Sequence, residues 1–425
     1  MTYINAVKYI NAHGCGTLSP ERMRMLCRYL GDPQRSLRFV HIVGGRGKTS
    51  SALMLSSILG EAGLKAGSFT NPHVFELRER ISIGNVPLSH AEFAEYVHKV
   101  ATAAEKMKSD IALASSKSAD EAADSAVTHK ITKNLLEGKI SPDPTSEEII
   151  CAAALVAFAD RSCQISILEC GESRADPTGV IEPPLVSFIC GGSLEGEQLR
   201  TACGTIRRGT REVICSGVGK EAYGIISGTC AKVGSRMTVP AHGELSIKEH
   251  RISGKVFDYR GKTYSVPFSA DFHISNVLAA IETVYALRRA GIPLHSADVA
   301  RGIAKARIPL RFDFVSLSPA IVIDSAETAA DIEHLGVALS NLRPLIGFKI
   351  KPVISEDFDE NMLLGAFSAF GFSESEPLRL EGKGIFKKLS AVIAELTDDD
   401  VLLVLGAPRF TGNTKKELER ALSYR

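Results

Sequence analysis

The stretch RFVHIVGGRGKTS, residues 38–50, decides how the first half of this sequence folds. A short apolar run at residues 39–43 is followed by glycines and a Lys-Thr-Ser triplet, and residues 52–64 then carry apolar side chains at helical spacing. Strand, glycine turn and helix in this order are typical of a phosphate-binding loop. Glycines let backbone N–H groups point inward, and the helix N-terminus carries positive potential.

The loop predicts a nucleotide site. The residues expected to surround the phosphates are Gly44, Gly45, Arg46, Gly47, Lys48, Thr49 and Ser50. Lys48 would reach the outer phosphates, and the hydroxyl of Thr49 or Ser50 would bind Mg²⁺. The spacing departs from G-x-x-x-x-G-K-[ST] because Ile42 stands at the position of the first glycine. A glycine-rich turn with an exposed lysine is therefore the alternative interpretation.

Length and composition restrict the class of protein. The chain has 425 residues, which suggests two or three domains, and its 44% of hydrophobic residues can form sizeable cores. The formal net charge of +1 gives no reason to expect a nucleic-acid or membrane partner. The nine cysteines include no C-x-x-C pair, which favours reduced thiols over disulfides or a zinc site. With no secretory signal and no long apolar run, a cytoplasmic protein is expected.

Alternating strand and helix patterns predict an α/β fold. Residues 165–168 are interpreted as a buried strand that ends on Glu169, where parallel sheets bind ligands, although a solvated strand end is the alternative. Residues 309–312 are interpreted as a linker, after which renewed alternation, with a helix near residues 358–370, predicts a second, smaller α/β domain. Residues 101–145 are rich in Ala, Ser, Lys and Asp and predict a surface excursion, either a solvated helical hairpin or a lid.

The order of these motifs resembles the folylpolyglutamate synthase/dihydrofolate synthase family, a branch of the Mur ligases. The segments that carry the resemblance are the loop at 44–50, Thr70-Asn71-Pro72-His73, Arg78-Glu79-Arg80-Ile81, Leu168-Glu169, Arg174-Ala175-Asp176-Pro177-Thr178, His273-Ile274-Ser275-Asn276, Pro309-Leu310-Arg311-Phe312-Asp313 and Asp324-Ser325-Ala326. The resemblance implies a P-loop-type central ATPase domain with a mostly parallel sheet at residues 1–306. It also implies a smaller Rossmann-like α/β domain at residues 307–425.

The resemblance further implies ATP-dependent, ADP-forming amide formation through an acyl phosphate, with ATP and Mg²⁺ as cofactors. The implied substrates are a folate or pteroate-type acid, L-glutamate and ATP, and the implied state is a monomer without nucleic-acid or membrane partners. Carried over by position, Lys48 supplies charge at the phosphates, while Ser50 and Glu169 hold Mg²⁺, with Thr49 as an additional candidate. The remaining implied site residues are Asn276 at the adenine, Arg311 and Asp324 closing the nucleotide site, and His73 beside the pterin or acyl acceptor.

Several positions depart from the family pattern, mostly where the family has a second metal and a nucleotide lid. Ala202 stands where the family has a carbamylated lysine, and residues 194–196 replace an L-D-H segment. Residues 324–328 replace D-G-A-H-N, Asn71 replaces a metal-binding serine, and Ile274 replaces a glutamine. Two alternatives therefore stand beside the glutamate ligase. One is a catalytically impaired homologue that binds ATP and acts as a binding or regulatory protein, and the other is a ligase for a different acid.

Overall fold

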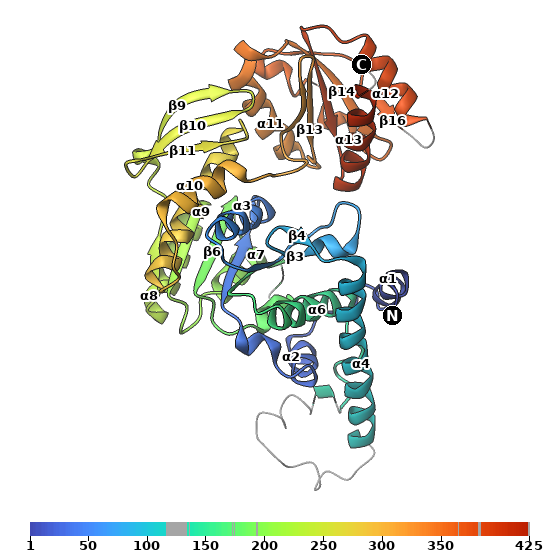
Figure 1. Cartoon of the computed structure of the whole chain (residues 1–425), viewed down its shortest axis with the longest axis vertical. Coiled ribbons are helices and arrows are strands. Elements are labelled where there is room, and N and C mark those ends of the chain that lie inside the picture. Colours follow the sequence, from blue (N-terminus) through green and yellow to red (C-terminus); the bar gives the residue numbers. More distant parts are fainter. Residues whose placement is uncertain are drawn as a thin grey trace. The chain divides into compact units, whose positions relative to one another are not determined.

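The computed structural model describes residues 1–115, 134, 135, 137–171, 173, 175–192, 194–363, 365–380 and 384–423. The chain forms two compact units, which are described one at a time (Figure 1). The first comprises Met1–Pro72, Leu77–Pro240 and Ala279–Val299, and the second comprises His73–Glu76, Ala241–Leu278 and Ala300–Arg425. The domain boundary expected between residues 306 and 307 stays a prediction. Much of the expected excursion at 101–145, namely residues 116–133, lies outside the described residues.

The first unit is built on an eight-stranded sheet with the order β4-β3-β2-β5-β1-β6-β7-β8. Its strands are β1 (Phe39–Gly44), β2 (Ala66–Phe69), β3 (Ile81–Ile83), β4 (Val86–Pro87), β5 (Ile165–Glu169), β6 (Val186–Gly192), β7 (Glu212–Val218) and β8 (Arg236–Thr238). Along the run β2-β5-β1-β6-β7-β8, each strand pairs in parallel with its neighbour. The pairings of β2 with β3 and of β3 with β4 are antiparallel. Every residue of β1 and β5 is buried, as expected for central strands covered on both faces. The predicted mostly parallel α/β fold is confirmed.

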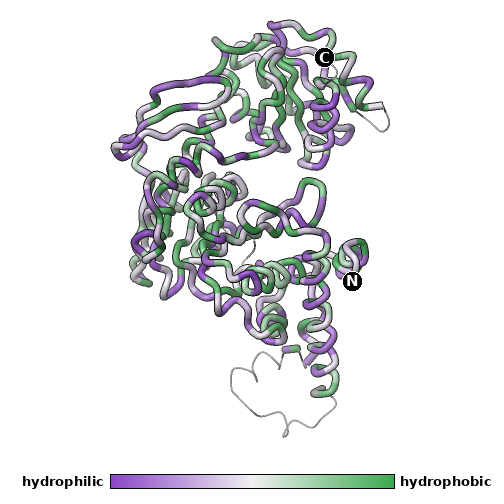
Figure 2. The backbone as a smooth tube through the Cα atoms, viewed as in Figure 1, coloured by the Kyte–Doolittle hydropathy of each residue, from purple (hydrophilic) through white to green (hydrophobic). Residues whose placement is uncertain are grey.

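Helices surround this sheet, and Figure 2 marks the hydropathy of each residue along the backbone. The apolar side chains of the central strands are buried. The helices are α1 (Tyr3–Ala12), α2 (Pro20–Tyr29), α3 (Lys48–Glu61), α4 (His90–Ser115), α6 (Ser146–Asp160), α7 (Gly196–Gly204), α8 (Lys220–Val233) and α9 (Asp271–Arg289). Helix α9 passes from the second unit into the first, and α10 (Ser296–Lys305) passes from the first into the second. The largest core forms where α6, buried along nearly its whole length, packs with α1, α2 and α4. Among the described residues, no helix is both long and apolar enough to cross a membrane.

A buried ion pair ties α2 to α6. Arg22, only 3% exposed, donates from Nε to Glu148 Oε2 at 2.7 Å and from Nη2 to Oε1 at 3.0 Å. The carboxylate of Glu148 also accepts the N–H of Ser19 at 2.9 Å and the N–H of Thr145 at 2.8 Å. Thr145 and Glu148 form the capping box that begins α6. Because every oxygen of the carboxylate is occupied, this charge is fully satisfied without water.

The second unit contains two sheets. A three-stranded antiparallel sheet is formed by β9 (Ser246–Arg251), β10 (Gly254–Tyr259) and β11 (Lys262–Val266). A six-stranded sheet has the order β12-β13-β17-β14-β15, with β16 (Leu378–Leu380) also paired to β14. Its other strands are β12 (Asp313–Leu317), β13 (Ala320–Asp324), β14 (Lys349–Ser355), β15 (Ser373–Glu374) and β17 (Asp400–Leu405), and its helices are α11 (Ala329–Leu342), α12 (Ile385–Ala394) and α13 (Pro408–Leu422).

The helix expected near residues 358–370 is wrong, because the described residues of this range form short 3₁₀ turns at Glu360–Met362 and Ser368–Phe370. Gly365, with φ of +71°, breaks any helical path between the two turns. The N–H groups of Phe367 and Ser368 donate to the side chain of Glu374, at 2.6 and 3.0 Å. These amides therefore bind a strand residue and not the carbonyls of a preceding helical turn.

Candidate active site

The phosphate-binding loop lies at the carboxyl end of β1, and close backbone packing explains its glycines. Gly44 has φ of +121°, and a Cβ there would lie 2.1 Å from the carbonyl oxygen of Cys190 in β6. At Gly45 a Cβ would lie 2.2 Å from the next carbonyl of β6, and the N–H of Gly45 donates to the Cys190 carbonyl at 3.0 Å. Gly47, with φ of +90°, then leads directly into α3. The helix N-terminus therefore faces the ligand edge of the sheet, as a phosphate site requires.

Lys48 is the first residue of α3, and its side chain folds back over the loop. Its Nζ donates to the carbonyl oxygens of Gly44 and Gly45, both at 3.0 Å. An ammonium group has three donors and no acceptor, so two of its donors are fixed by the loop backbone. The charge is held where the loop would bind phosphate.

A hydroxyl, a carboxylate and one peptide group meet beside this lysine. β5 pairs with β1 so that Glu169 lies opposite Ile42, at the carboxyl edge of the sheet. Thr49 Oγ1 lies 2.9 Å from Glu169 Oε2 and 3.2 Å from Oε1. The N–H of Asn71 donates to Glu169 Oε2 at 3.2 Å, and the Asn71 carbonyl oxygen lies 3.3 Å from Thr49 Oγ1, whose single hydrogen can point to either acceptor. Residues far apart in the sequence are thus brought into one polar cluster.

Burial changes the acidity of Glu169, which is 5% exposed. Loss of hydration raises the pKa of its carboxyl group from 4.5 to about 7, and the charge of Lys48 and the donors on Asn71 and Thr49 oppose this rise. A carboxylate and a hydroxyl are oxygen ligands of the kind that Mg²⁺ prefers, with water and phosphate completing its shell. Within the described residues no group of three or more His, Cys, Asp or Glu could hold a metal. The cluster therefore fits Mg²⁺ bound through few protein ligands.

The raised pKa of Glu169 predicts a pH-dependent effect on stability. Because the folded protein binds this proton more tightly than the unfolded chain, the stabilising contribution is complete below pH 4.5 and is lost as pH rises through about 7. Glu169→Gln, which resembles the protonated group, should be the more stable protein in EDTA. We expect its advantage in the free energy of unfolding to grow by about 2 kcal/mol between pH 5.5 and pH 8.5.

Urea denaturation at the two pH values measures this difference. Glu221→Gln, at an exposed glutamate in α8, is the matched control. An advantage of Glu169→Gln that is the same at both pH values would contradict the raised pKa.

The structure places the other loop residues as follows. The hydroxyl that meets Glu169 belongs to Thr49, whereas Ser50 is the next residue of α3 and is buried. Arg46 lies exposed at the tip of the loop. Asn71, which stands where the family has serine, contacts the cluster through its backbone.

Four expected site residues belong to the second unit: His73, Asn276, Arg311 and Asp324. Two of these are brought together, since Arg311 Nη1 lies 3.7 Å from Asp324 Oδ1 and donates to the Ser325 carbonyl at 2.8 Å. Asp324 also accepts the N–H of Phe312 at 2.7 Å. Phe312 has φ of +49°, a conformation that a bulky residue adopts only when its surroundings impose it. The backbone beside Arg311 is therefore held in one specific arrangement.

Sequence reasoning missed one residue of this arrangement, His273. Its Nε2 lies 3.1 Å from the carbonyl oxygen of Arg311, and burial lowers the pKa of its imidazole to about 4. The neutral ring can therefore donate to that carbonyl. Asn276 follows one helical turn later on α9 and is partly exposed. The His-Ile-Ser-Asn segment contained the signal, but only its asparagine was selected.

The positions that depart from the family pattern do not form a second metal site here. Ala202 is 0% exposed and lies in an apolar cluster with Val43, Ile189 and Ile206. Glu195 precedes α7 as its N-cap, and Gly196 follows with φ of +49°. A carbamylated lysine has no counterpart at Ala202, so we derive no chemistry from a second metal.

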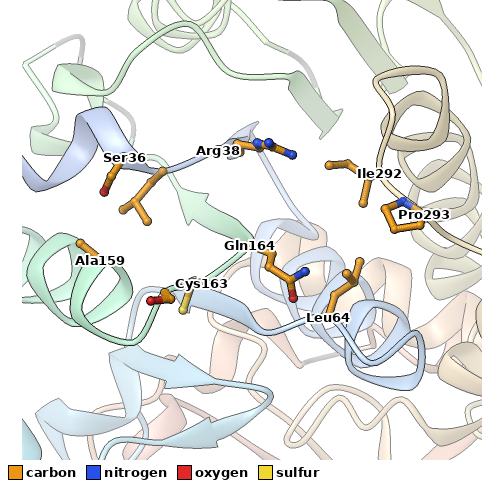
Figure 3. Close-up of a pocket in the computed structure, with 10 residues that line it drawn as sticks. Ser36, Arg38, Leu64, Ala159, Cys163, Gln164, Ile292 and Pro293 are labelled. Carbon is orange, nitrogen blue, oxygen red and sulfur yellow. The ribbon is translucent and has the colours of Figure 1, made fainter.

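A pocket of about 400 Å³ opens at the opposite, amino-terminal end of the central strands (Figure 3). Arg38 directly precedes β1 and Gln164 directly precedes β5, and both line this pocket. The remaining lining residues are Ser36, Leu37, Leu64, Ala159, Ser162, Cys163, Ile292 and Pro293. None of the expected site residues is among them, so the pocket is separate from the phosphate-binding loop.

Known proteins resemble this chain along most of its length, although no family model matches it. The folylpolyglutamate synthase of Lacticaseibacillus casei is 27% identical over 363 residues, which cover 80% of this chain and 77% of that protein. The dihydrofolate synthase/folylpolyglutamate synthase of Mycobacterium tuberculosis is 27% identical over 424 residues, which cover 91% and 74%. A solved structure of folylpolyglutamate synthetase from Lactobacillus casei matches with a TM-score of 0.77 at 22% identity, over 98% of this chain and 100% of that chain. Along most of its length the chain is therefore similar to proteins of the folylpolyglutamate synthase/dihydrofolate synthase family.

Proposed function

We propose that this protein is an ATP-dependent, ADP-forming ligase that joins a folate or pteroate-type acid to L-glutamate. The observation that carries the proposal is the cluster of Lys48, Thr49 and Glu169 at the phosphate-binding loop. The similarity to these relatives and their names support the choice of acid and amine. Relatives of this family have also been solved with AMPPCP and folate, which supports ATP and a folate as ligands.

The loop is suited to holding the triphosphate. Backbone N–H groups at the N-terminus of α3 would bind phosphate oxygens, and Lys48 would neutralise charge on the β- and γ-phosphates. Thr49 and Glu169 would hold Mg²⁺, with Ser50 as a further candidate. When bound, Mg²⁺ would supply positive charge that offsets the charge of the phosphates. Adenine contact by Asn276, closure of the nucleotide site by Arg311 and Asp324, and acceptor contact by His73 are further parts of the proposal.

The proposed reaction has two steps, both assisted by positioning and charge neutralisation. A carboxylate oxygen of the acid attacks the γ-phosphorus, the bond from that phosphorus to ADP breaks, and an acyl phosphate forms. The glutamate nitrogen then attacks the acyl carbon, loses a proton, and displaces phosphate. The products are the amide, ADP and phosphate. We further propose that the protein acts as a monomer in the cytoplasm.

One assay tests the ligase against its alternatives. Purified protein is incubated with ATP, Mg²⁺, L-glutamate and either reduced folate or dihydropteroate, and phosphate release is measured together with product mass. Release that requires both acid and glutamate is the expected result. ATP binding without acid-dependent release, even at high protein concentration, would overturn the ligase and favour a binding or regulatory protein. Release with a different carboxylic acid alone would assign a different acyl substrate.

A further inference from the structure

An arginine–glutamate clamp lies behind the polar cluster. Arg80, 3% exposed, donates from Nη1 to Glu147 Oε1 at 2.9 Å and from Nη2 to Oε2 at 2.7 Å. This two-bond contact is the strong, geometrically specific form of an arginine–carboxylate pair. The guanidinium also lies over the ring of Phe69, 5.1 Å from its centre. The arginine is therefore fixed in orientation as well as in position.

The acceptor of the clamp is itself on a rigid element. Glu147 lies in the first turn of α6, between Ser146 and the capping residue Glu148. The same turn is anchored to α2 through the buried pair of Arg22 and Glu148. The backbone of Glu147 can move only with the start of α6, so its carboxylate meets Arg80 from an anchored main chain.

Arg80 in turn fixes the peptide groups that reach the cluster. The N–H of Thr70 donates to the Arg80 carbonyl at 3.0 Å, and Arg80 Nε donates to the Thr70 carbonyl at 3.3 Å. One residue thus binds both backbone polar groups of Thr70. The next residue, Asn71, donates its N–H to Glu169, and its carbonyl oxygen lies 3.3 Å from Thr49 Oγ1.

The hydrogen bonds with Arg80 hold Thr70 just beyond the point where the pairing of β2 with β5 ends. The parallel pairing of β2 with β5 ends at Phe69 and Leu168, one residue before Thr70. Beyond this point, Thr70 is held by Arg80 on its other side. Without the guanidinium, the Thr70 carbonyl would lose its donor and the Asn71 peptide could rotate away from Glu169.

We propose that Arg80 and Glu147 are positioning residues that hold the Asn71 peptide in place and thereby prepare Thr49 and Glu169 to bind Mg²⁺ with the nucleotide. This role rests on the proposed function, since it concerns the same nucleotide site. The hydrogen bonds of Arg80 and Glu147 reach the polar cluster through Thr70 and Asn71. Partners of this kind typically change metal affinity or activity by about 10–100-fold when they are replaced.

Calorimetric titration with a non-hydrolysable ATP analogue, in Mg²⁺ and in EDTA, tests the clamp. The quantity compared is the gain in affinity that Mg²⁺ provides. We expect Arg80→Met to lower this gain about 10–100-fold and to leave affinity in EDTA unchanged. Arg80→Lys should not restore the gain, because an ammonium cannot make the planar two-bond contact. Glu147→Gln should also lower the gain, although Arg80 is still present. This variant tests the clamp if the Arg80 variants fail to fold.

Arg200→Met, which removes an exposed ion pair to Glu197 on α7, is the matched control. Thermal unfolding of each variant shows whether the replacement lowers stability. If Arg80 and Glu147 had a purely structural role, the melting temperature would fall, but the folded variants would keep the full gain in analogue affinity that Mg²⁺ provides. An unchanged gain in Arg80→Met and Glu147→Gln, or full restoration by Arg80→Lys, would overturn the clamp alone. Absence of magnesium-dependent binding in the unsubstituted protein would instead overturn the proposed function.

Discussion

Replacing Lys48 with alanine is expected to slow substrate-dependent phosphate release by about 10²–10³-fold, the usual loss when one preorganised charge is removed from a reacting group. The ammonium is already fixed by the carbonyls of Gly44 and Gly45, so it needs no rearrangement to meet the phosphates. Its removal takes away the positive charge of the loop together with these two hydrogen bonds. Affinity for ATP should fall as well, and titration with the non-hydrolysable analogue measures this separately from turnover.

Lys65→Ala is the matched control for this experiment. Lys65 precedes β2, and its Nζ donates to the Arg161 carbonyl at 3.0 Å, at the opposite end of the sheet from the loop. The control should bind ATP and release phosphate as the unsubstituted protein does. If Lys48→Ala retained both ATP affinity and turnover, the assignment of residues 44–50 as the phosphate-binding loop would be wrong.

Replacing Glu148 with alanine is expected to lower the free energy of unfolding by about 3–5 kcal/mol, the range measured when one partner of a buried ion pair is removed. Arg22 would remain buried without its counter-charge, and the N–H groups of Ser19 and Thr145 would lose their acceptor. The loss of the capping box would add to the effect at the start of α6.

Urea denaturation at neutral pH measures the loss. Glu197→Ala removes an exposed partner on α7 and should change stability by no more than about 1 kcal/mol. The double replacement Arg22→Met with Glu148→Met should recover much of the loss, because no unpaired charge then remains buried. A loss below about 1 kcal/mol in Glu148→Ala would contradict the proposed energetic weight of this pair.

The local parts of the site could be predicted because short segments determine them. The glycines and Lys48 follow a strand and begin a helix, and Glu169 ends an apolar strand, so both positions at the carboxyl edge follow from the sequence pattern. The choice between Thr49 and Ser50 did not follow. Successive residues of a helix point about 100° apart, so the start of α3 at Lys48 decides which hydroxyl faces Glu169.

Contacts between distant segments could not be predicted from the sequence. Arg80 belongs to a recognisable Arg-Glu-Arg-Ile segment, but nothing in the sequence pairs it with Glu147, which is 67 positions away. The error at residues 358–370 has a related cause. An apolar run there favoured a helix, whereas Gly365 and the side chain of Glu374 impose turns that only the folded arrangement reveals.

The buried carboxyl group of Glu169 has a consequence for the release of protons when a metal ion and a nucleotide bind. With a pKa of about 7, the group is shared between protonated and ionised forms in a neutral cell. Metal ions bind the ionised form, so under the proposed function a nucleotide that arrives with its cation would displace a hydrogen ion from Glu169 into the solvent. Occupancy of the loop would then respond to small changes in acidity, with protons acting as competitors of the metal. In this respect one buried side chain couples nucleotide capture to the proton concentration of its surroundings.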